Sequence, residues 1–512
     1  MDLAETLSRL GAQAHLEFDG LRPHQSHAWH AFLVQLAALV VVRSDDGRLD
    51  RSAEEWRSAL LSLVETDDPE VARDAWTLVV EDPTRPAFLQ PSIPEGDWQR
   101  YKLAAETPDD LDLLVTAKSH DVKQRTMTHA SAAHWAYALL TLQTFQGFSG
   151  RGNYGIARMN SGFGNRPLFT AAPGLGWAER FARDVGVWLD QRDTLLDVGY
   201  EMTDGGPALL WTLPWDGSSP AIEFGACDPF FLEICRRVRL TQSEGGHPTA
   251  WQAPTTSPFL EAKERAGDTG DIWTPVQISD KKGKVEVSSL TVAPSGLTYK
   301  KLQDVVFGPE WPRKPALKIR EDDGSVPILI FQAMVRGQGK TEGWHERRIL
   351  APREKLSWLK QSDRRTLLGR IAEDRVKTVG EVTRRILRPA LCALLQGGGD
   401  DLNLRDDRVD PWTSRFDRAV DDEFFERLWH DVPADGKIDR ETAQRAWVER
   451  LRELARSTLE AAIAEAPISE ARNYRAIVQS EARLEAGFLK HFSAFLSTAD
   501  SASQTSSGAL ND

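Results

Sequence analysis

The most constraining feature of this chain is a change of pattern near residue 352. Before it, helical and strand patterns alternate; beyond it, strand signals vanish and apolar residues recur at helical spacing. Two apolar stripes carry the change, one at Phe416, Val420, Phe424 and Leu428, the other at Trp447, Leu451, Leu454, Thr458 and Ala461. The sequence therefore predicts an α+β protein, in which a large mixed α/β N-terminal domain precedes a C-terminal four-helix bundle.

We expect the mixed domain to span residues 1–352 and the bundle to span residues 353–496 of the 512-residue chain. A chain of this length exceeds the usual size of one domain. Glycine and proline clusters at 397–401 and 433–436 mark breaks between helices of the bundle. Residues 497–512 are mostly Ser, Thr and Ala with few apolar groups, so we predict a disordered tail there.

Charge, cysteine count and hydropathy narrow the class of protein. The net charge is −13, whereas a protein that binds nucleic acid unaided is usually basic. Any nucleic-acid contact should therefore come from a local patch or from membership of a larger basic assembly. The three cysteines form no C-x-x-C pair and the N-terminus lacks a signal-peptide pattern, so we expect a cytoplasmic protein. The longest apolar stretch, residues 31–42, is too short for a membrane span and predicts a buried helix.

Two stretches of the mixed domain have clear strand patterns. Residues 276–280 and 285–290 alternate around the turn Lys281-Lys-Gly-Lys284, which predicts a β-hairpin. Residues 327–335, with the sequence PILIFQAMV, predict a buried strand.

Residues 147–167 are dense in glycine, arginine and asparagine, and residues 150–155 match the pattern G-x-G-x-x-G. A dinucleotide loop lies between a strand and a helix, because the N-terminus of the helix holds the pyrophosphate. Here residues 132–143, rich in helix formers, precede the loop, and residues 156–164 have no helical pattern. The context therefore argues against a nucleotide cofactor, and we predict none.

The string Arg336-Gly-Gln-Gly-Lys-Thr341 ends like a Walker A loop. The full pattern needs a glycine where Met334 stands and a helix after Thr341, and neither requirement is met. A P-loop-like NTPase that uses Lys340 and Thr341 remains the alternative reading of this turn.

Metal and catalytic patterns are weak. His24, His27 and His30 lack a nearby acidic or cysteine partner, so we interpret them as the start of an amphipathic helix and predict no metal site. The sequence contains no G-x-S-x-G, no H-E-x-x-H and no carboxylate pair suited to acid–base catalysis. We therefore predict a protein that is not an enzyme.

Three turns share one chemistry, because each offers cationic or amide donors that suit phosphates and base edges. Glycines among them let the backbone approach a ligand closely. The donors are Arg151, Asn153, Arg158, Asn160, Asn165 and Arg166 in the first turn, Lys281, Lys282 and Lys284 in the second, and Arg336, Gln338 and Lys340 in the third. Ordinary surface turns would have the same composition, and both interpretations stay open at this level.

Several short strings, in order along most of the chain, resemble the CasA family, the large subunits of the type I-E CRISPR surveillance complex (Cascade). They are Arg85-Pro-Ala-Phe-Leu-Gln90, Leu114-Val-Thr-Ala-Lys-Ser-His-Asp121, Gln143-Thr-Phe-Gln-Gly-Phe-Ser-Gly150, Cys227-Asp-Pro229, the lysine turn at 281–284, and Arg336-Gly-Gln338 before Glu346-Arg-Arg348. The predicted C-terminal bundle also fits this family.

The resemblance implies a non-catalytic subunit that recognises the protospacer-adjacent motif (PAM) on double-stranded DNA. Such a subunit helps to open the duplex for pairing with the guide RNA and helps to recruit the CRISPR helicase-nuclease. The implied partners are other Cascade subunits, guide RNA, double-stranded target DNA and the helicase-nuclease, with no membrane.

The family reads the PAM with a glycine loop, a lysine and a glutamine-tipped wedge. By resemblance the loop is Gly147, Phe148, Ser149 and Gly150, the lysine is Lys282 and the wedge is Gln338, with Arg151, Asn153, Lys281 and Lys340 as further expected DNA contacts. Lys118, Ser119 and His120 lie where the family meets the guide RNA. This chain departs from some members in keeping only Cys227 and Cys235 of a cysteine cluster, and in the glycines that flank Gln338.

Overall fold

We describe the protein from a computed structural model of the whole chain. The structure describes residues 1–496 except 113, 115–126, 128–129, 146–149, 156–165, 244–245, 322, 325, 338–339, 434–438 and 468–471, and it describes 336–337 and 340–342 by their backbone alone. The chain divides into two compact units. Unit 1 comprises Met1–Leu297 and Pro309–Ala351, and unit 2 comprises Thr298–Gly308 and the chain from Pro352 onward. The predicted disordered tail, 497–512, lies outside the described residues.

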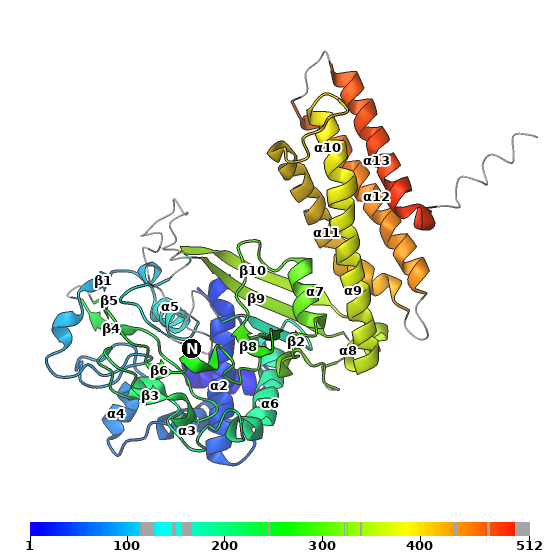
Figure 1. Cartoon of the computed structure of the whole chain (residues 1–512). Coiled ribbons are helices and arrows are strands. Elements are labelled where there is room, and N and C mark those ends of the chain that lie inside the picture. Colours follow the sequence, from blue (N-terminus) through cyan, green and yellow to red (C-terminus); the bar gives the residue numbers. More distant parts are fainter. Residues whose placement is uncertain are drawn as a thin grey trace, which may run out of the picture. The chain divides into compact units, whose positions relative to one another are not determined.

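Unit 1 combines helices with small separate sheets, as the α+β prediction requires (Figure 1). Its described helices are α1 (Leu3–Gly11), α2 (Pro23–Ser44), α3 (Ala53–Ser62), α4 (Pro69–Asp74), α5 (Ala132–Thr144) and α6 (Trp177–Leu196). Its described strands are β1 (Leu103–Ala105), β2 (Leu168–Ala172), β3 (Ile222–Glu223), β4 (Arg237–Gln242), β5 (Pro248–Ala253), β6 (Leu260–Glu261), β7 (Val276–Lys281), β8 (Lys284–Ser289), β9 (Ile328–Gly337) and β10 (Lys340–Leu350).

The strands form two three-stranded antiparallel sheets and two strand pairs among the described residues. The sheets have the orders β1-β5-β4 and β10-β9-β2, while β3 pairs in parallel with β6 and β7 pairs with β8 as a hairpin. In the second sheet Phe331 of β9 lies opposite Phe169 of β2, and their rings meet edge to face at 4.9 Å. The predicted hairpin at 276–290 and the predicted strand at 327–335 are both confirmed.

Helix α2 is the core of unit 1. Every residue from His27 to Val41 is buried, so the helix is covered on all sides, whereas we expected an amphipathic helix at its start. A helix that is apolar around its whole circumference belongs inside a protein. Within the described part of the chain, α2 has the length and hydropathy of a membrane span, but 89% of that window is buried in the structure. The predicted buried helix at 31–42 is thus confirmed.

Unit 2 is the predicted four-helix bundle, joined by a helix from earlier in the chain. Its described helices are α7 (Tyr299–Phe307), α8 (Ser357–Lys360), α9 (Ser362–Val382), α10 (Arg388–Leu395), α11 (Asp410–Asp431), α12 (Arg440–Glu465) and α13 (Asn473–Leu496). Helices α9 and α10 form one rod through the π-helical turn Thr383–Leu387. Pro389 explains the turn, since its ring removes one N–H and would clash with the preceding turn of a regular helix.

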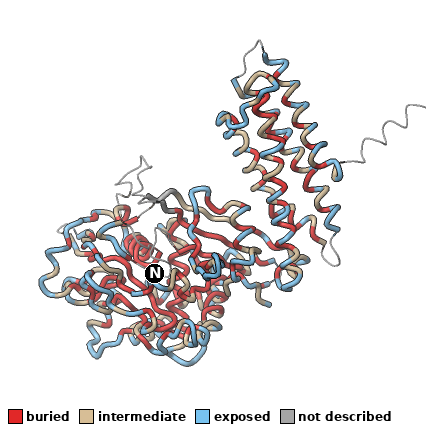
Figure 2. Tube along the Cα trace, viewed as in Figure 1, coloured by how far each residue is buried: buried red, intermediate tan, exposed pale blue. Residues whose placement is uncertain are grey.

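Burial follows the inner sides of the bundle helices (Figure 2). On α11 the predicted stripe Phe416, Val420, Phe424 and Leu428 is fully buried. On α12 the prediction is partly wrong: Leu454 and Ala461 are only half-buried, whereas Ala455, Leu459 and Ala462 are buried. Because α12 packs against α11, α9 and α13, its buried surface is wider than one stripe.

Candidate nucleic-acid interface

The lysine turn lies at the exposed tip of the β7–β8 hairpin. Lys282 and Gly283 both have positive φ angles, 59° and 81°, the combination that a two-residue type I′ turn requires. The Asp280 carboxylate accepts a hydrogen bond of 2.8 Å from the Gly283 N–H and holds the turn closed. Lys281 Nζ lies 2.7 Å from Glu286, whereas Lys282 has no ion pair among the described residues. The turn thus presents one neutralised lysine and one uncommitted lysine.

The described part of the glycine segment forms an exposed turn. Gly150 and Gly152 have φ angles of 97° and 83°, which favour glycine, and the Asn153 N–H donates to the Gly150 carbonyl at 3.0 Å. Thr255 ties the turn to unit 1, because its N–H donates to Gly152 and its hydroxyl donates to Tyr154. Arg151 and Asn153 are both exposed. Gly147, Phe148 and Ser149 lie outside the described residues, as do Arg158, Asn160 and Asn165 of the same segment.

A hollow of about 760 Å³ adjoins this turn. Pro254, which lines it, would contact a Cβ placed on Gly152 at 3.6 Å. Arg100, which lies 3.0 Å from Asp97, and Lys102 also line the hollow. Cationic and amide donors therefore continue beyond the predicted contact residues.

The third turn joins two antiparallel strands. Gly337 at the end of β9 pairs with Lys340 at the start of β10, and a bulge interrupts the pairing between Thr341 and Gly343. Gln338, the predicted wedge tip, lies outside the described residues. A P-loop needs a helix directly after its Lys-Thr pair, but Lys340 and Thr341 begin the eleven-residue strand β10. The P-loop alternative is therefore wrong, since the phosphate-binding helix N-terminus is missing.

The predicted guide-RNA contacts Lys118, Ser119 and His120 lie outside the described residues. Of the sequence-predicted nucleic-acid residues, the structure thus describes Gly150, the side chains of Arg151, Asn153, Arg166, Lys281, Lys282 and Lys284, and the backbone of Arg336 and Lys340.

Arg166 is not a surface donor, contrary to the sequence interpretation. Its side chain is 1% exposed, its Nε lies 2.7 Å from Asp271, and Gln35 accepts a further hydrogen bond from it at 3.0 Å. Burial disfavours its charge, but the charges of Asp271 and Glu233 outweigh burial and raise the pKa of Arg166. A guanidinium this deep needs such compensation, so Arg166 is committed to the core.

Sequence reasoning missed the residues that anchor these turns. Phe145 directly precedes residues 146–149 and Arg166 directly follows residues 156–165; the Arg166 Cζ lies 5.0 Å from the centre of the Phe145 ring. His27 of α2 packs on Phe145 at 4.3 Å and on Trp344 of β10 at 4.6 Å between ring centres. The nearest signal in the sequence is the histidine spacing of α2, which does not reveal partners more than a hundred residues away.

Two glutamines of the family-like strings are structural. The buried Gln143 amide donates to the carbonyls of Leu89 and Arg236, and its oxygen accepts from the N–H groups of Cys235 and Arg236. Gln90 likewise donates to Leu78 and accepts from the Leu240 N–H. Each glutamine joins separate chain segments inside unit 1, as buried polar groups must be satisfied.

The cysteines and the described acidic groups form no metal centre. Cys227 and Cys235 are buried, with Sγ atoms near the carbonyls of Glu223 and Leu142. In the described part of the chain, no group of three His, Cys, Asp or Glu side chains is placed to hold a metal ion. The sequence expectation of no metal stays a prediction.

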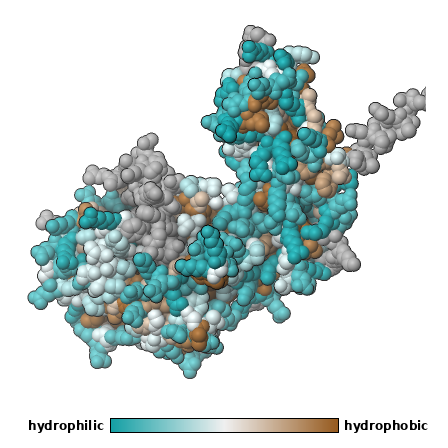
Figure 3. Space-filling model, viewed as in Figure 1, coloured by the Kyte–Doolittle hydropathy of each residue, from teal (hydrophilic) through white to brown (hydrophobic). Residues whose placement is uncertain are grey.

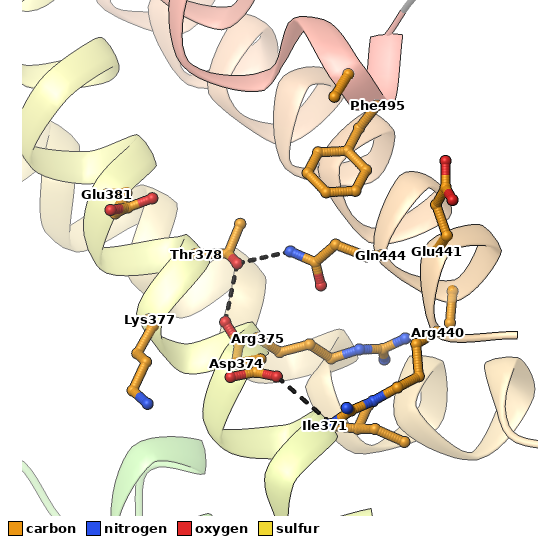
Figure 4. A pocket seen from close by; sticks show the side chains of 12 residues that line it. Ile371, Asp374, Arg375, Lys377, Thr378, Glu381, Arg440, Glu441, Gln444 and Phe495 are labelled. Atoms are coloured by element: carbon orange, nitrogen blue, oxygen red, sulfur yellow. Dashed lines mark hydrogen bonds and ion pairs between the residues drawn. The ribbon is translucent and has the colours of Figure 1, made fainter. Parts of the chain in front are cut away.

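Unit 2 contains a hollow of about 660 Å³ between α9, α12 and α13 (Figure 4). Gln444 donates to the Thr378 hydroxyl at 2.8 Å, and Arg440 lies 3.9 Å from Asp374, so two polar pairs connect α9 and α12 across the hollow (Figure 4). Acidic and basic residues mix around the rim.

The visible face of unit 1 is also mixed, with hydrophobic residues scattered rather than gathered into one patch (Figure 3).

Comparison with known proteins decides the family. The family model described as CRISPR-associated protein Cse1 matches residues 2–458. The chain belongs to the Cse1 family. The predicted resemblance to CasA is thereby confirmed, and no curated protein matches the chain in sequence.

Solved Cse1 structures share the fold. Cse1 from Thermobifida fusca has a TM-score of 0.62 and 14% identity, with 94% of this chain and 93% of that chain covered. CasA (Cse1) from Thermus thermophilus has a TM-score of 0.58 and 18% identity, with 95% of each chain covered. Cse1 from Acidimicrobium ferrooxidans has a TM-score of 0.59 and 15% identity, with 96% and 94% covered. The Cse1 fold thus extends over nearly the whole chain.

Proposed function

We propose that this Cse1-family protein is the non-catalytic Cascade subunit that recognises the PAM on double-stranded DNA, helps to unwind it for guide-RNA pairing and helps to recruit the helicase-nuclease. The observation that carries the proposal is the family match over residues 2–458. The exposed turns of unit 1 support it, because they present cationic and amide hydrogen-bond donors at the tips of narrow turns. The protein would work in the cytoplasm with other Cascade subunits, guide RNA and target DNA.

Lys282 is the cation best suited to the minor groove. It stands at the tip of a two-residue turn, and no described carboxylate competes for its charge, whereas Glu286 neutralises Lys281. The minor groove is about 6 Å wide and presents A N3 and T O2 acceptors, so a slim cationic tip can enter it. Readout there is degenerate, and we expect the protein to tolerate several PAM sequences.

The glycine segment would lie along the same groove. The described turn at Gly150 and Gly152 carries little side-chain bulk, and Arg151 and Asn153 project from it as exposed donors. We propose that Gly147, Phe148, Ser149 and Gly150 make the close backbone approach. Arg151 and Asn153 would then contact phosphates or base edges beside it.

The β9–β10 turn would act as the wedge. A two-stranded ribbon is stiff enough to carry Gln338 between base pairs, and Lys340 stands at the start of the returning strand. Unstacking costs a few kcal/mol per step, which RNA–DNA pairing recovers because strand exchange is nearly balanced. Lys118, Ser119 and His120 would meet the guide RNA and help to anchor the subunit.

The protein alone should bind DNA weakly, since its net charge is −13. Within the complex, the few cationic contacts proposed here should make PAM binding sensitive to salt.

The test is duplex binding by the reconstituted RNA-guided complex, with PAM and PAM-less DNA at fixed salt. We expect Lys282→Ala to weaken binding to PAM DNA by roughly tenfold, about 1.4 kcal/mol. Lys281→Ala is the matched control, because it removes an equal charge one residue away that Glu286 already neutralises. Equal effects of the two substitutions would refute the assignment of Lys282.

Gln338→Ala tests the wedge separately. It should slow strand opening, followed by a fluorescent base analogue beside the PAM, while assembly with the other subunits and guide RNA stays intact. If both Lys282→Ala and Gln338→Ala leave PAM preference and opening unchanged, the turns are ordinary loops and the subunit is a scaffold only.

A further inference from the structure

Two of the proposed DNA-contacting elements are anchored on one buried side chain. His27, near the start of α2, is 0% exposed. Its ring meets Phe145 edge to face at 4.3 Å and Trp344 at a tilt of 44° and 4.6 Å. Phe145 is the last described residue before the glycine loop, and Trp344 follows the β9–β10 turn on β10. The glycine loop and the β9–β10 turn are therefore both adjacent to residues that pack on the same buried ring.

Arg166 closes the same cluster from another side. Its guanidinium stacks on Phe145 at 5.0 Å and on Trp273 at 5.3 Å, and Asp271 holds it in place. The segment 146–165 is thus bounded by Phe145 and Arg166, two side chains in direct contact. The base of the segment is fixed, although its sequence is long.

The cluster acts through ring packing rather than charge. Among the described residues the His27 ring makes no hydrogen bond to another side chain, and contact with the His24 backbone is the smallest influence on its pKa. Burial, followed by electrostatic interaction with His24 and Arg166, holds the pKa of His27 well below its ordinary value. The imidazole is therefore neutral at physiological pH, and it serves as a flat spacer between two larger rings.

We propose that His27 is a positioning residue that couples the glycine loop to the β9–β10 wedge, so that PAM contact and strand separation occur as one step. This inference rests on the proposed function. His27 touches neither loop tip; it holds Phe145 and Trp344 in one packed cluster. Packed cores shift between discrete arrangements rather than bending gradually, so a displacement at Phe145 is passed to Trp344.

The coupling can be measured by comparing closed and opened DNA. If the wedge is uncoupled from the glycine loop, the complex should lose the ability to open a closed duplex but should still bind an opened one. The experiment compares three DNAs in the reconstituted complex: a closed PAM duplex, the same duplex with unpaired bases beside the PAM, and a closed PAM-less duplex. The test variant is His27→Leu, which keeps apolar volume but removes the flat ring. Phe88→Ala is the control for general loss of core packing, as Phe88 packs on Phe32 and Trp211 elsewhere in unit 1.

We expect His27→Leu to weaken binding to the closed PAM duplex by about tenfold and to the opened duplex by less than about twofold. His27→Phe, which restores a flat ring, should recover the closed-duplex binding to within about threefold. Equal losses on closed and opened DNA would overturn the coupling, and so would the same pattern in Phe88→Ala. If the unaltered protein shows no preference for PAM DNA, the proposed function itself is wrong and the coupling fails with it.

A double-mutant cycle gives a second measure. Phe145→Leu and Trp344→Leu should each weaken closed-duplex binding, and the double variant should be no worse than the more damaging single variant, since both break the same cluster. In the His27→Leu background, the effects of Phe145→Leu and Trp344→Leu on closed-duplex binding should become independent of each other. Additive effects in both backgrounds would contradict the proposal.

Discussion

At the scale of single residues, unit 1 holds charges inside its core, and Asp184 and Arg166 are paired there with opposite charges. Asp184 accepts hydrogen bonds from His30 and Trp273 at 2.9 Å, and from Arg183 at 2.8 Å. Although burial alone would raise the pKa of Asp184, these contacts lower it to about 2. Such pairs do not show in the sequence, because Arg166 and Asp271 stand 105 positions apart. This distance explains why the sequence pattern places Arg166 wrongly among the loop donors.

His27 differs from these groups because no carboxylate compensates it, which gives a first prediction. Its pKa is lowered in the folded state, so the unfolded chain takes up a proton first as the pH falls below about 6.5. The stability contributed by the neutral ring is therefore complete above that pH and is lost below it, by about 1.4 kcal/mol per pH unit. His27→Phe should remove this part of the acid sensitivity.

The measurement is the free energy of unfolding from denaturant titrations between about pH 7.5 and about pH 5. The difference between the unaltered protein and His27→Phe should be constant above about pH 7 and should grow steadily below about pH 6.5. His30, whose pKa burial also lowers, stays in both proteins and cancels. A pH-independent difference would show that His27 is not buried in its neutral form.

At the scale of elements, sequence patterns correctly predicted the strands and turns that depend mainly on neighbouring residues. The hairpin at 276–290 and the strand at 327–335 followed from alternation and turn residues, and both are present. The face of α12 was only partly predicted, because three neighbouring helices widen its buried surface. For the candidate site, sequence alone found the turns but not their anchors, since Phe145, His27 and Trp344 meet only in the folded chain.

The β7–β8 turn yields a second prediction. Gly283 has a φ of 81°, and a Cβ added to it would find no described atom within 4 Å, so Gly283→Ala meets no steric clash and only backbone strain. That strain should cost about 1–2 kcal/mol in hairpin stability while leaving every charge in place. Faster hydrogen exchange of the β7 and β8 amides would reveal it. Exchange unchanged from the unaltered protein would mean that the turn adopts another type.

At the scale of the whole molecule, the helix α7 shows the limit of reading domains along the sequence. The pattern change near 352 locates the bundle helices, but Tyr299–Phe307 precedes it and belongs to unit 2. Tyr299 is 0% exposed, its hydroxyl lies 2.9 Å from Asp417, and its ring packs on Phe424 at 4.8 Å. Burial and the Asp417 carboxylate raise the pKa of Tyr299, so its hydroxyl remains protonated and donates.

Tyr299 supplies a third prediction. Tyr299→Ala should lower the stability of unit 2 by about 3–5 kcal/mol, because it opens a cavity beside Phe424. Tyr299→Phe removes only the hydrogen bond to Asp417 and should cost about 1 kcal/mol. Thermal unfolding followed by helical circular dichroism would measure both. Equal, small effects would show that α7 is not part of the bundle's core.

The placement of α7 means that the polypeptide passes between the units three times, after Leu297, Gly308 and Ala351. No single stretch of sequence therefore encodes unit 2, and a gene that began at residue 352 would yield a bundle without α7. A protease cut at that point would separate the two pieces on a denaturing gel. In native solution, however, the two pieces would stay associated, because α7 of the N-terminal piece packs in the bundle formed by the C-terminal piece.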